Sequence, residues 1–279
     1  SNHEFQKSLS VVGNGFVSDM ENGIYPTIIE DGLYFKPRDV VDDDGEMVKE
    51  GVKVDGIRLE GLKLSYVLFQ SSGVIRDFQI VKCQLSGSER PLLFESSTEN
   101  FVLRQSVCDG VQFGAGNWCN HQNFYICGSY VAVIDFPKEY CTVNVDHSLI
   151  NSLYQNNLVG LSLGNSIVKA SGVVANNCVF IDNTPYNLIG AGNWVDCKYA
   201  GIFEESMNDL AWDGVKTFKL KYPEEYIGTD GTQVGLYGGP YPYNPTPSIP
   251  QIKESHIDTT VAANGKLKVS VTVEAQTED

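Results

Sequence analysis

Apolar positions in the middle of the chain follow one short pattern, apolar-x-apolar-x-x-(Leu, Cys or Ser)-x-apolar, six times. The copies begin at Ile57, Phe78, Phe101, Phe124, Val143 and Val173. By subtraction, these first positions are 21, 23, 23, 19 and 30 residues apart. A short pattern separated by loops of variable length indicates one repeated supersecondary unit rather than a helical or heptad period. The pattern therefore predicts a solenoid.

Each copy has the spacing of two short strands. Its first two apolar positions are two residues apart and point to the same face of a strand. The x-x step interrupts the alternation as a bend or bulge does, and a second pair of inward positions follows. The stretch is rich in Val, Ile, Phe, Tyr, Asn, Ser and Gly, which favours strands over helices, and the Leu-x-x-Leu-x-Leu framework of leucine-rich repeats is absent. We therefore predict an all-β fold, a parallel β-helix solenoid.

Like side chains occupy the same position in successive copies. Phe78, Phe101 and Phe124 should stack inside the solenoid at about 4.8 Å per rung. A column of small residues should stack in the same way, at Cys83, Ser106, Ser129, Ser148 and Cys178.

The two ends of the solenoid are less regular. Leu33 and Phe35 fit the first positions of an N-terminal rung, and either Trp194 or Ala200 with Ile202 fits the opening of a last rung. The sequence Gly-Ala-Gly-Asn-Trp occurs at 114–118 and again at 190–194. Its glycines favour a tight structural corner over a ligand loop.

The C-terminal part of the chain does not follow the repeat pattern. Prolines at 240, 242, 245, 247 and 250 predict an extended connector, because proline cannot continue a sheet ladder. Residues 257–262 and 267–273 predict a hairpin around an Asn264-Gly265 turn. We divide the chain into a β-helix with its N-terminal cap (1–239), the connector (240–253) and a hairpin extension (254–279). An isolated hairpin is marginal in water, so we expect it to dock on the chain's own solenoid rather than on a second molecule.

The segment 230–239 reads Asp-Gly-Thr-Gln-Val-Gly-Leu-Tyr-Gly-Gly. It resembles the ending of bacterial right-handed parallel β-helix proteins of the pectin-lyase-like superfamily, and the preceding rungs are similar to that group too. The resemblance covers about residues 33–239. It implies a right-handed helix, export to the periplasm, cell surface or extracellular space, and action on or binding of polysaccharides.

In polysaccharide-active members of that superfamily, the substrate lies along the outside of one sheet. The register places Arg104, Tyr125, Asp146 and His147 on such a face, within three adjacent rungs. A base, a phenol and a cation in one groove suit proton abstraction beside a uronate carboxylate, whose charge Arg104 would neutralise. The alternative is a solvated polar face without chemistry. The calcium-dependent lyases of that superfamily need several aspartates on adjacent rungs, and Asp146 stands alone in this register. Polygalacturonase-like hydrolases need neighbouring aspartates with a nearby histidine, and Asp146-His147 supplies half of such a site.

Composition limits the partners. The net charge is −15, from 35 acidic and 20 basic residues, which disfavours nucleic acid and anionic membranes. We expect no membrane-spanning segment and no signal peptide. The seven cysteines contain no C-x-x-C pair, so we expect no zinc site, no other metal and no cofactor, while one or two disulfides stay open. The pattern does not determine the oligomeric state.

Three functions are compatible with these observations. The leading hypothesis is an exported bacterial β-helix protein that binds or presents to carbohydrate at the cell surface without catalysis, because fold does not confer function. The second is a polysaccharide lyase or glycoside hydrolase that acts on an acidic polysaccharide through Arg104, Tyr125, Asp146 and His147. The third is a structural or adhesive surface module in which the hairpin is the interacting element.

Overall fold

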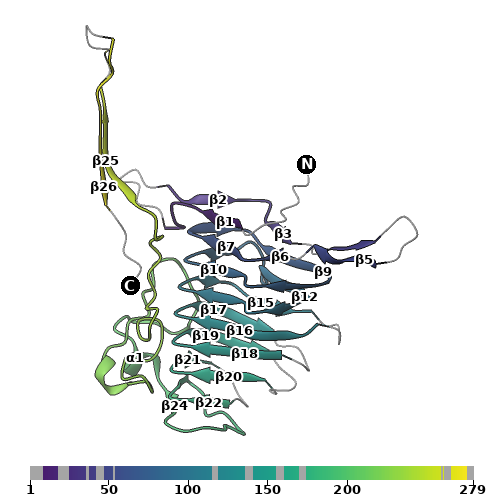
Figure 1. Ribbon diagram of the computed structural model, residues 1–279. Helices are drawn as coiled ribbons and strands as arrows, with labels where there is room; N and C mark the ends of the chain where they lie inside the picture. Colours follow the sequence, from purple (N-terminus) through teal and green to yellow (C-terminus); the bar gives the residue numbers. More distant parts are fainter. Residues whose placement is uncertain are drawn as a thin grey trace.

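The chain forms a parallel β-solenoid whose coils stack along one axis (Figure 1). The computed structural model describes residues 9–17, 25–35, 38–41, 47–52, 54–114, 119–135, 141–154, 160–169, 174–258, 260 and 265–274. We divide the stacked parallel strands into three faces, called sheets 1, 2 and 3. The predicted all-β solenoid is thereby confirmed.

Sheet 1 contains the first strand of each repeat. In stacking order it consists of β1 (Leu9–Val12), β7 (Ile57–Glu60), β10 (Gln79–Val81), β13 (Val102–Arg104), β16 (His121–Cys127), β18 (Cys141–Asp146), β20 (Leu161–Gly164) and β22 (Val174–Asn176).

Sheet 2 contains the second strand of each repeat. Its order is β2 (Thr27–Ile29), β8 (Leu62–Leu64), β11 (Gln84–Leu85), β14 (Val107–Cys108), β17 (Tyr130–Asp135), β19 (Leu149–Tyr154), β21 (Ile167–Val168), β23 (Val179–Ile181) and β24 (Trp194–Cys197).

Sheet 3 closes the N-terminal coils. It consists of β3 (Leu33–Phe35), β9 (Val67–Arg76), β12 (Leu92–Glu99) and β15 (Val111–Phe113), with β6 (Val54–Asp55) beside the end of β9. The remaining elements are the antiparallel pair β4 (Arg38–Val41) and β5 (Met47–Val52), the helix α1 (Tyr199–Ile202), the 3₁₀ turn η1 (Pro223–Glu225) and the antiparallel hairpin β25 (Gln251–Ile257) and β26 (Val269–Glu274).

A left-handed residue forms the corner between sheets 1 and 2 in each repeat, and it accounts for the x-x step. The corner residues have φ between 42° and 64°; they are Gly61, Lys82, Gln105, Gly128, His147, Asn165 and Asn177. One residue in this conformation turns the chain sharply, so the next inward side chain begins a new face. We call these seven residues the corner column.

The small-residue column next to the corner is confirmed, and it is a hydrogen-bonded ladder. The Ser129 hydroxyl accepts a bond from the Ser106 amide at 3.1 Å, and the Ser148 hydroxyl accepts one from the Ser129 amide at 3.3 Å. Each hydroxyl also donates to a carbonyl two residues earlier in its own rung, as Ser129 does to Cys127 at 2.9 Å. These bonds satisfy backbone groups that the corner removes from the strand ladders.

The predicted aromatic column is also confirmed. Phe101 is fully buried and stacks on Phe78 and Phe124, with ring centroids 5.7 and 4.5 Å away. A second column, which the repeat pattern did not predict, comes from sheet 3 and meets the first edge to face, as Phe69 and Phe94 do with Phe101 at 5.8 and 4.9 Å. Edge-to-face and offset pairs are the favourable aromatic geometries, so the two columns form one interlocked core.

One complete rung lies inside the 30-residue gap between the last two predicted copies. Leu161, Leu163, Ser166 and Val168 match the pattern, and β20 pairs with β18 before it and with β22 after it. The amide of Ser148 donates to the Ser166 hydroxyl at 3.1 Å, so the small-residue ladder continues through this rung. The repeat pattern is therefore present in the sequence at this rung. The 30 residues from Val143 to Val173 form two short rungs rather than one long rung.

Both predicted end rungs differ from expectation. Leu33 and Phe35 lie in β3 and pair with Val67 and Phe69 of sheet 3, so they do not open the first rung. That position belongs to β1, where Leu9 pairs with Ile57. At the other end, Trp194 pairs with Val179 and extends sheet 2. The second Gly-Ala-Gly-Asn-Trp copy is a corner, with Gly190 and Gly192 at φ 127° and 72°, whereas residues 115–118 of the first copy lie outside the described residues.

Residues 199–243 cover the outer face of sheet 2 from β14 to β24. Its outward side chains, among them Val107, Leu149 and Ile167, form a second hydrophobic core with Phe203 and Leu236. The Tyr130 hydroxyl in this core accepts a hydrogen bond from the Trp212 amide at 3.0 Å. This side of the solenoid is thus closed by the chain's own C-terminal third.

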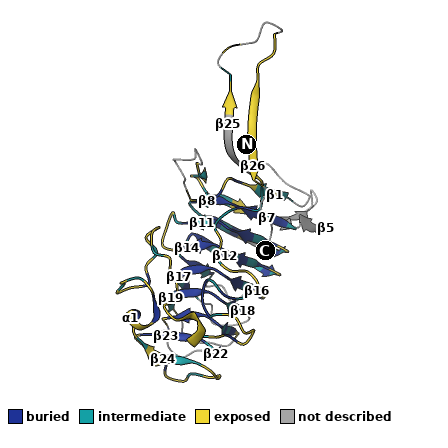
Figure 2. Cartoon of the chain, turned by 90° about the vertical axis from the view of Figure 1, so that its left-hand side faces the viewer, coloured by how far each residue is buried: buried dark blue, intermediate teal, exposed yellow. Residues whose placement is uncertain are grey.

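A C-terminal hairpin is confirmed, but its first strand is β25 at Gln251–Ile257 rather than the predicted 257–262, and its expected docking is wrong. Its antiparallel pairing runs from Gln251 opposite Glu274 to Ile257 opposite Val269. Asn264 of the predicted turn lies outside the described residues. The hairpin projects beyond the N-terminal end of the solenoid, and β26 is exposed along its whole length (Figures 1 and 2). The connector, rather than the hairpin, is the part that packs on the solenoid.

His121 is an ionisable side chain buried in the aromatic core. Its ring lies edge-on to Phe94 and Phe113, and its Nδ1 is 2.9 Å from the Thr98 hydroxyl. Its Nε2 is buried and has no partner among the described residues. Burial disfavours the charged imidazolium and lowers the pKa of His121 from its usual 6.5 to about 4.

We expect His121 to destabilise the fold as the pH falls from 6.5 towards 4. In that window the unfolded chain takes up a proton that the folded chain does not, and the loss reaches about 3 kcal/mol at its lower end. Urea unfolding of the native chain and of His121→Phe, at several pH values in the window, measures how the free energy of unfolding depends on pH. The variant should show the flatter pH dependence. His256→Phe, on the exposed hairpin, is the control and should behave as the native chain does; equal slopes for all three proteins would contradict the assignment.

Candidate functional site

The connector and the segment before it run along the corner column in the direction opposite to the coils. We call residues 226–248 the strap. Its contacts begin where the side-chain amide of Asn177 donates through Nδ2 to the Ile227 carbonyl at 3.3 Å. They end where the Ser248 amide donates to Glu60 Oε1 at 2.7 Å. The strap thus follows the corner column from the last rungs to the first, and then enters the hairpin (Figure 1).

Residues of the corner column contact the part of the strap that crosses them. Gln105 donates through its amide to the Pro242 carbonyl at 2.7 Å. Gly128 faces the Tyr241 carbonyl so closely that a Cβ there would lie 2.1 Å from its oxygen. A Cβ on Gly61 would lie 2.6 Å from Pro247. Glycine is therefore required at two crossings by close approach as well as by positive φ.

Glu60 holds the upper end of the strap. Its carboxylate is buried, with Oε2 2.7 Å from Arg58 Nη2 and Oε1 accepting the amide and hydroxyl of Ser248. Burial alone would raise the pKa of Glu60, but the Ser248 and Arg58 hydrogen bonds outweigh it and lower the pKa. Glu60 occupies an outward position of β7, one residue after the inward Leu59, and the strap is what buries it.

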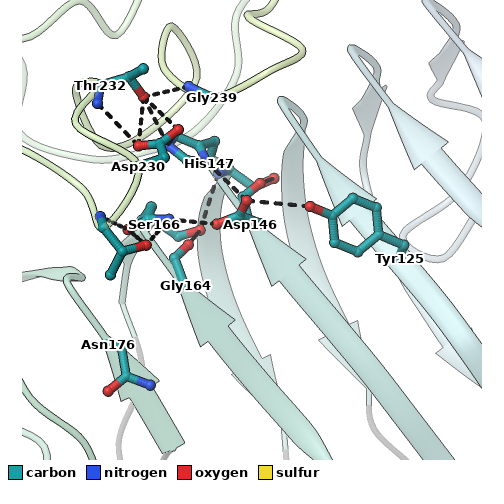
Figure 3. A network of polar contacts seen from close by, with 12 residues as sticks. Tyr125, Asp146, His147, Gly164, Ser166, Asn176, Asp230, Thr232 and Gly239 are labelled. Carbon is teal, nitrogen blue, oxygen red and sulfur yellow. Dashed lines mark hydrogen bonds and ion pairs between the residues drawn. The ribbon is translucent and has the colours of Figure 1, made fainter.

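His147 lies at the centre of a polar cluster beneath the strap (Figure 3). Only 2% of its side chain is exposed, although the repeat register places it at an outward corner. Its Nδ1 is 3.0 Å from Asp146 Oδ2, and its Nε2 is 3.2 Å from Thr232 Oγ1 and 3.4 Å from Asp230 Oδ2. Gly238 and Gly239 pass against the ring so closely that a Cβ on either would clash with it. An imidazole flanked by two carboxylates thus joins the solenoid to the strap.

The Asp230-Gly-Thr segment is bonded within itself as well as to His147. Asp230 Oδ1 accepts the amide and hydroxyl of Thr232 at 3.0 and 2.9 Å, and the Gly239 amide donates to the Thr232 hydroxyl at 2.7 Å. Partial burial would raise the pKa of Asp230, but the Thr232 hydrogen bonds and the neighbouring His147 lower it. Since the Thr232 proton goes to Asp230, Nε2 of His147 acts as the donor towards Thr232.

The line from Thr232 through His147 to Asp146 has the order of a nucleophile, a base and an orienting carboxylate. Two observations argue against that chemistry. The Thr232 hydroxyl already donates to Asp230, and His147 Nδ1, although near Asp146, makes no hydrogen bond of acceptable geometry in the described part of the chain. The arrangement therefore fixes the strap to the solenoid. We call Asp146, His147, Asp230 and Thr232 together the clasp.

The structure brings three of the four predicted site residues together. Asp146 lies next to His147. It accepts a hydrogen bond from the Tyr125 hydroxyl at 3.2 Å and, on its other oxygen, one from the side-chain Nδ2 of Asn165 at 2.9 Å. Arg104 lies in the same outward row as Asp146 but two strands away. Its guanidinium sits 4.7 Å from the ring centroid of Tyr241 in the strap, a cation–π distance.

Burial and the negative charge of Asp146 raise the pKa of Tyr125. The phenol therefore stays protonated at neutral pH, which suits hydrogen-bond donation and not proton abstraction.

Sequence reasoning missed the residues that complete the cluster. Asp230 and Thr232 lie in the segment that carries the family resemblance, but that resemblance assigns no role to either residue. Asn165, which also accepts from the Thr229 amide at 2.9 Å, belongs to the rung hidden in the 30-residue gap. Tyr241 lies in the proline-rich connector, where no periodicity indicated a contact.

A second outward row of sheet 1 runs beside the strap and stays partly accessible. Its members pair across successive strands and are all of intermediate exposure; they are Arg58, Gln79, Val102, Tyr125, Asn144, Ser162 and Val174. Arg58 Nη1 donates to Gln79 at 3.2 Å. We call this row the sheet 1 strip. It presents a guanidinium, amides, hydroxyls and an aromatic ring along the solenoid axis.

The thiols and acidic side chains of the described residues are not arranged as a metal site. All seven cysteines lie among the described residues and are free. Burial raises the pKa of Cys83, Cys108 and Cys178 to about 12, so these thiols are unreactive at neutral pH. Within the described ranges, no group of three or more His, Cys, Asp or Glu side chains is placed to hold a metal ion.

No family model, no curated protein and no solved structure matches this chain. In the part of the chain that the structure describes, no helix has the length and apolar character needed to cross a membrane.

Proposed function

We propose that the chain is an exported β-helix protein that binds a polysaccharide along the sheet 1 strip, beside the strap, without catalysing its cleavage. The observation that carries the proposal is the strip itself, an unbroken row of half-exposed side chains across seven paired strands. Its amides, hydroxyls and guanidinium can donate to and accept from sugar hydroxyls, and Tyr125 adds an aromatic surface with a polar tip. A linear polymer suits a linear array repeated along one axis.

The state of His147 supports binding over catalysis. A general base must reach the proton that it abstracts, and this ring is shielded by Gly238 and Gly239 and engaged by groups of the strap. Export rests on the resemblance to secreted β-helix proteins and is part of the same proposal.

Affinity gel electrophoresis with xylan, alginate and polygalacturonate tests the proposal. We expect at least one polymer to retard the native chain, and Tyr125→Ala to weaken that binding about tenfold or more, as loss of a central aromatic contact does. Tyr154→Ala is the matched control, because Tyr154 is an exposed tyrosine of β19 that does not belong to the strip. Retardation by no polymer, or equal loss in both variants, would contradict the proposal.

One observation favours a second candidate, a lyase or glycoside hydrolase. The Tyr125 hydroxyl and the Asp146 carboxylate are hydrogen-bonded on the accessible side of sheet 1, with Arg104 in the same row as Asp146. Release of unsaturated product or of new reducing ends from the same three polymers, abolished by Asp146→Asn, would establish this candidate in place of pure binding.

A further inference from the structure

The hairpin β25–β26 presents an apolar face that nothing in the described part of the chain covers. Val269, Val271 and Val273 alternate along β26 and therefore share one face, and Ile257 lies directly opposite Val269. These four residues are 55%, 48%, 53% and 58% exposed in the order named. Ser270, Thr272 and Glu274 occupy the opposite face of β26. The hairpin therefore has the one-sided pattern of half a β-sandwich.

The chain's own solenoid cannot easily receive this face. The strap is fixed at Glu60 by Ser248, and Pro247 is packed against Gly61. Only two residues, at 249 and 250, separate this anchor from β25. The anchor therefore directs the hairpin away from the sheets, beyond β1 and β2, as both views show (Figures 1 and 2).

The charge of the hairpin indicates which partner it fits. Residues 251–274 contain three lysines (253, 266 and 268) and three acidic residues (254, 258 and 274), so their net charge is zero. The net charge of −15 therefore resides entirely in the rest of the chain. A neutral apolar face offers no attraction to a polyanion or to an acidic membrane surface. It can meet an identical face without repulsion, while its projection keeps the two acidic solenoids apart.

We propose that the hairpin is a dimerisation arm whose apolar face packs against the same face of the hairpin of a second copy. Such a contact is isologous, because the same patch of each copy meets across a two-fold axis. The two hairpins then pack face to face as the two layers of a small β-sandwich. Four apolar side chains from each copy make a small interface, so the dimer forms and dissociates with concentration. The proposal is independent of polysaccharide binding.

Sedimentation velocity of the full chain, from about 1 to 100 µM, tests the proposal. We expect a monomer–dimer equilibrium, and Val271→Lys should weaken the dimer at least about tenfold, because it places two lysines in the apolar contact. Thr272→Lys is the matched control, since it adds the same charge one residue away on the opposite face. Circular dichroism of both variants verifies that the solenoid is intact.

A native chain that is monomeric throughout this range would overturn the proposal, as would a dimer that survives Val271→Lys or is weakened equally by Thr272→Lys. Cross-linking gives a second measurement. A short bis-maleimide should join two copies of Val271→Cys and not of Thr272→Cys, with the native chain as the background for its own thiols. A monomer whose β26 amides resist hydrogen exchange would instead show that the arm folds onto its own solenoid, and would likewise overturn the proposal.

Discussion

Phe101→Ala should lower the free energy of unfolding by about 3–5 kcal/mol, the usual cost of emptying a fully buried phenylalanine site. Phe101 contacts four other rings, two in its own column and two in the column from sheet 3. The cavity would lie between columns held on both sides by hydrogen-bonded strands, so it cannot collapse. Urea unfolding followed by circular dichroism measures the loss.

Val102→Ala is the control for this prediction. Val102 lies between the core residues Phe101 and Leu103, but its side chain points outward in the sheet 1 strip. Its truncation should therefore lower the free energy of unfolding clearly less than that of Phe101. A loss of less than about 1 kcal/mol in Phe101→Ala would mean that the aromatic columns are not the core of the solenoid.

His147→Leu should release the strap and lower the free energy of unfolding by about 2–4 kcal/mol. The substitution leaves Asp146 and Asp230 facing an apolar side chain and removes the donor to the Thr232 hydroxyl. Leucine also differs in shape from the flat ring against which Gly238 and Gly239 pack. Hydrogen exchange read by mass spectrometry should show faster exchange in peptides that cover residues 228–239.

Asn144→Leu is the matched control, because it introduces the same side chain three residues away in the sheet 1 strip. It should leave exchange in the strap unchanged. If His147→Leu and the native chain exchange at the same rate over residues 228–239, the clasp does not hold the strap, and packing of residues 234–236 in the second core is sufficient.

The repeat itself was encoded locally enough to be predicted. In each copy two inward apolar positions, a left-handed corner and a Leu, Cys or Ser follow within a few residues, and each rung contacts only the rungs beside it. This is why the columns that contain Phe101 and Ser129 could be predicted correctly without any structure. The rung at Leu161 fits the same pattern and was equally predictable. Leu33 has the spacing of a first rung but lies in sheet 3, because spacing alone does not identify the sheet to which a strand belongs.

The candidate site was predictable only in part. The register placed Tyr125, Asp146 and His147 in adjacent rungs, and the structure brings them together. It could not reveal that His147 is buried, because the groups that bury it come from a segment with no repeat. Arg104 was placed in the correct row, but its contact with Tyr241 depends on the path of the strap.

The sequence by itself therefore determined the solenoid, its columns and the existence of the hairpin, because these features depend on neighbours along the chain or on the same pattern in the next rung. Tertiary structure alone decided which outward residues are covered and where the hairpin points. The contacts responsible join residues 64 positions apart for Thr229 and Asn165 and 188 apart for Ser248 and Glu60. Such pairs share no periodicity, and each forms only when the folded solenoid has aligned its corner residues into a surface on which the strap can lie.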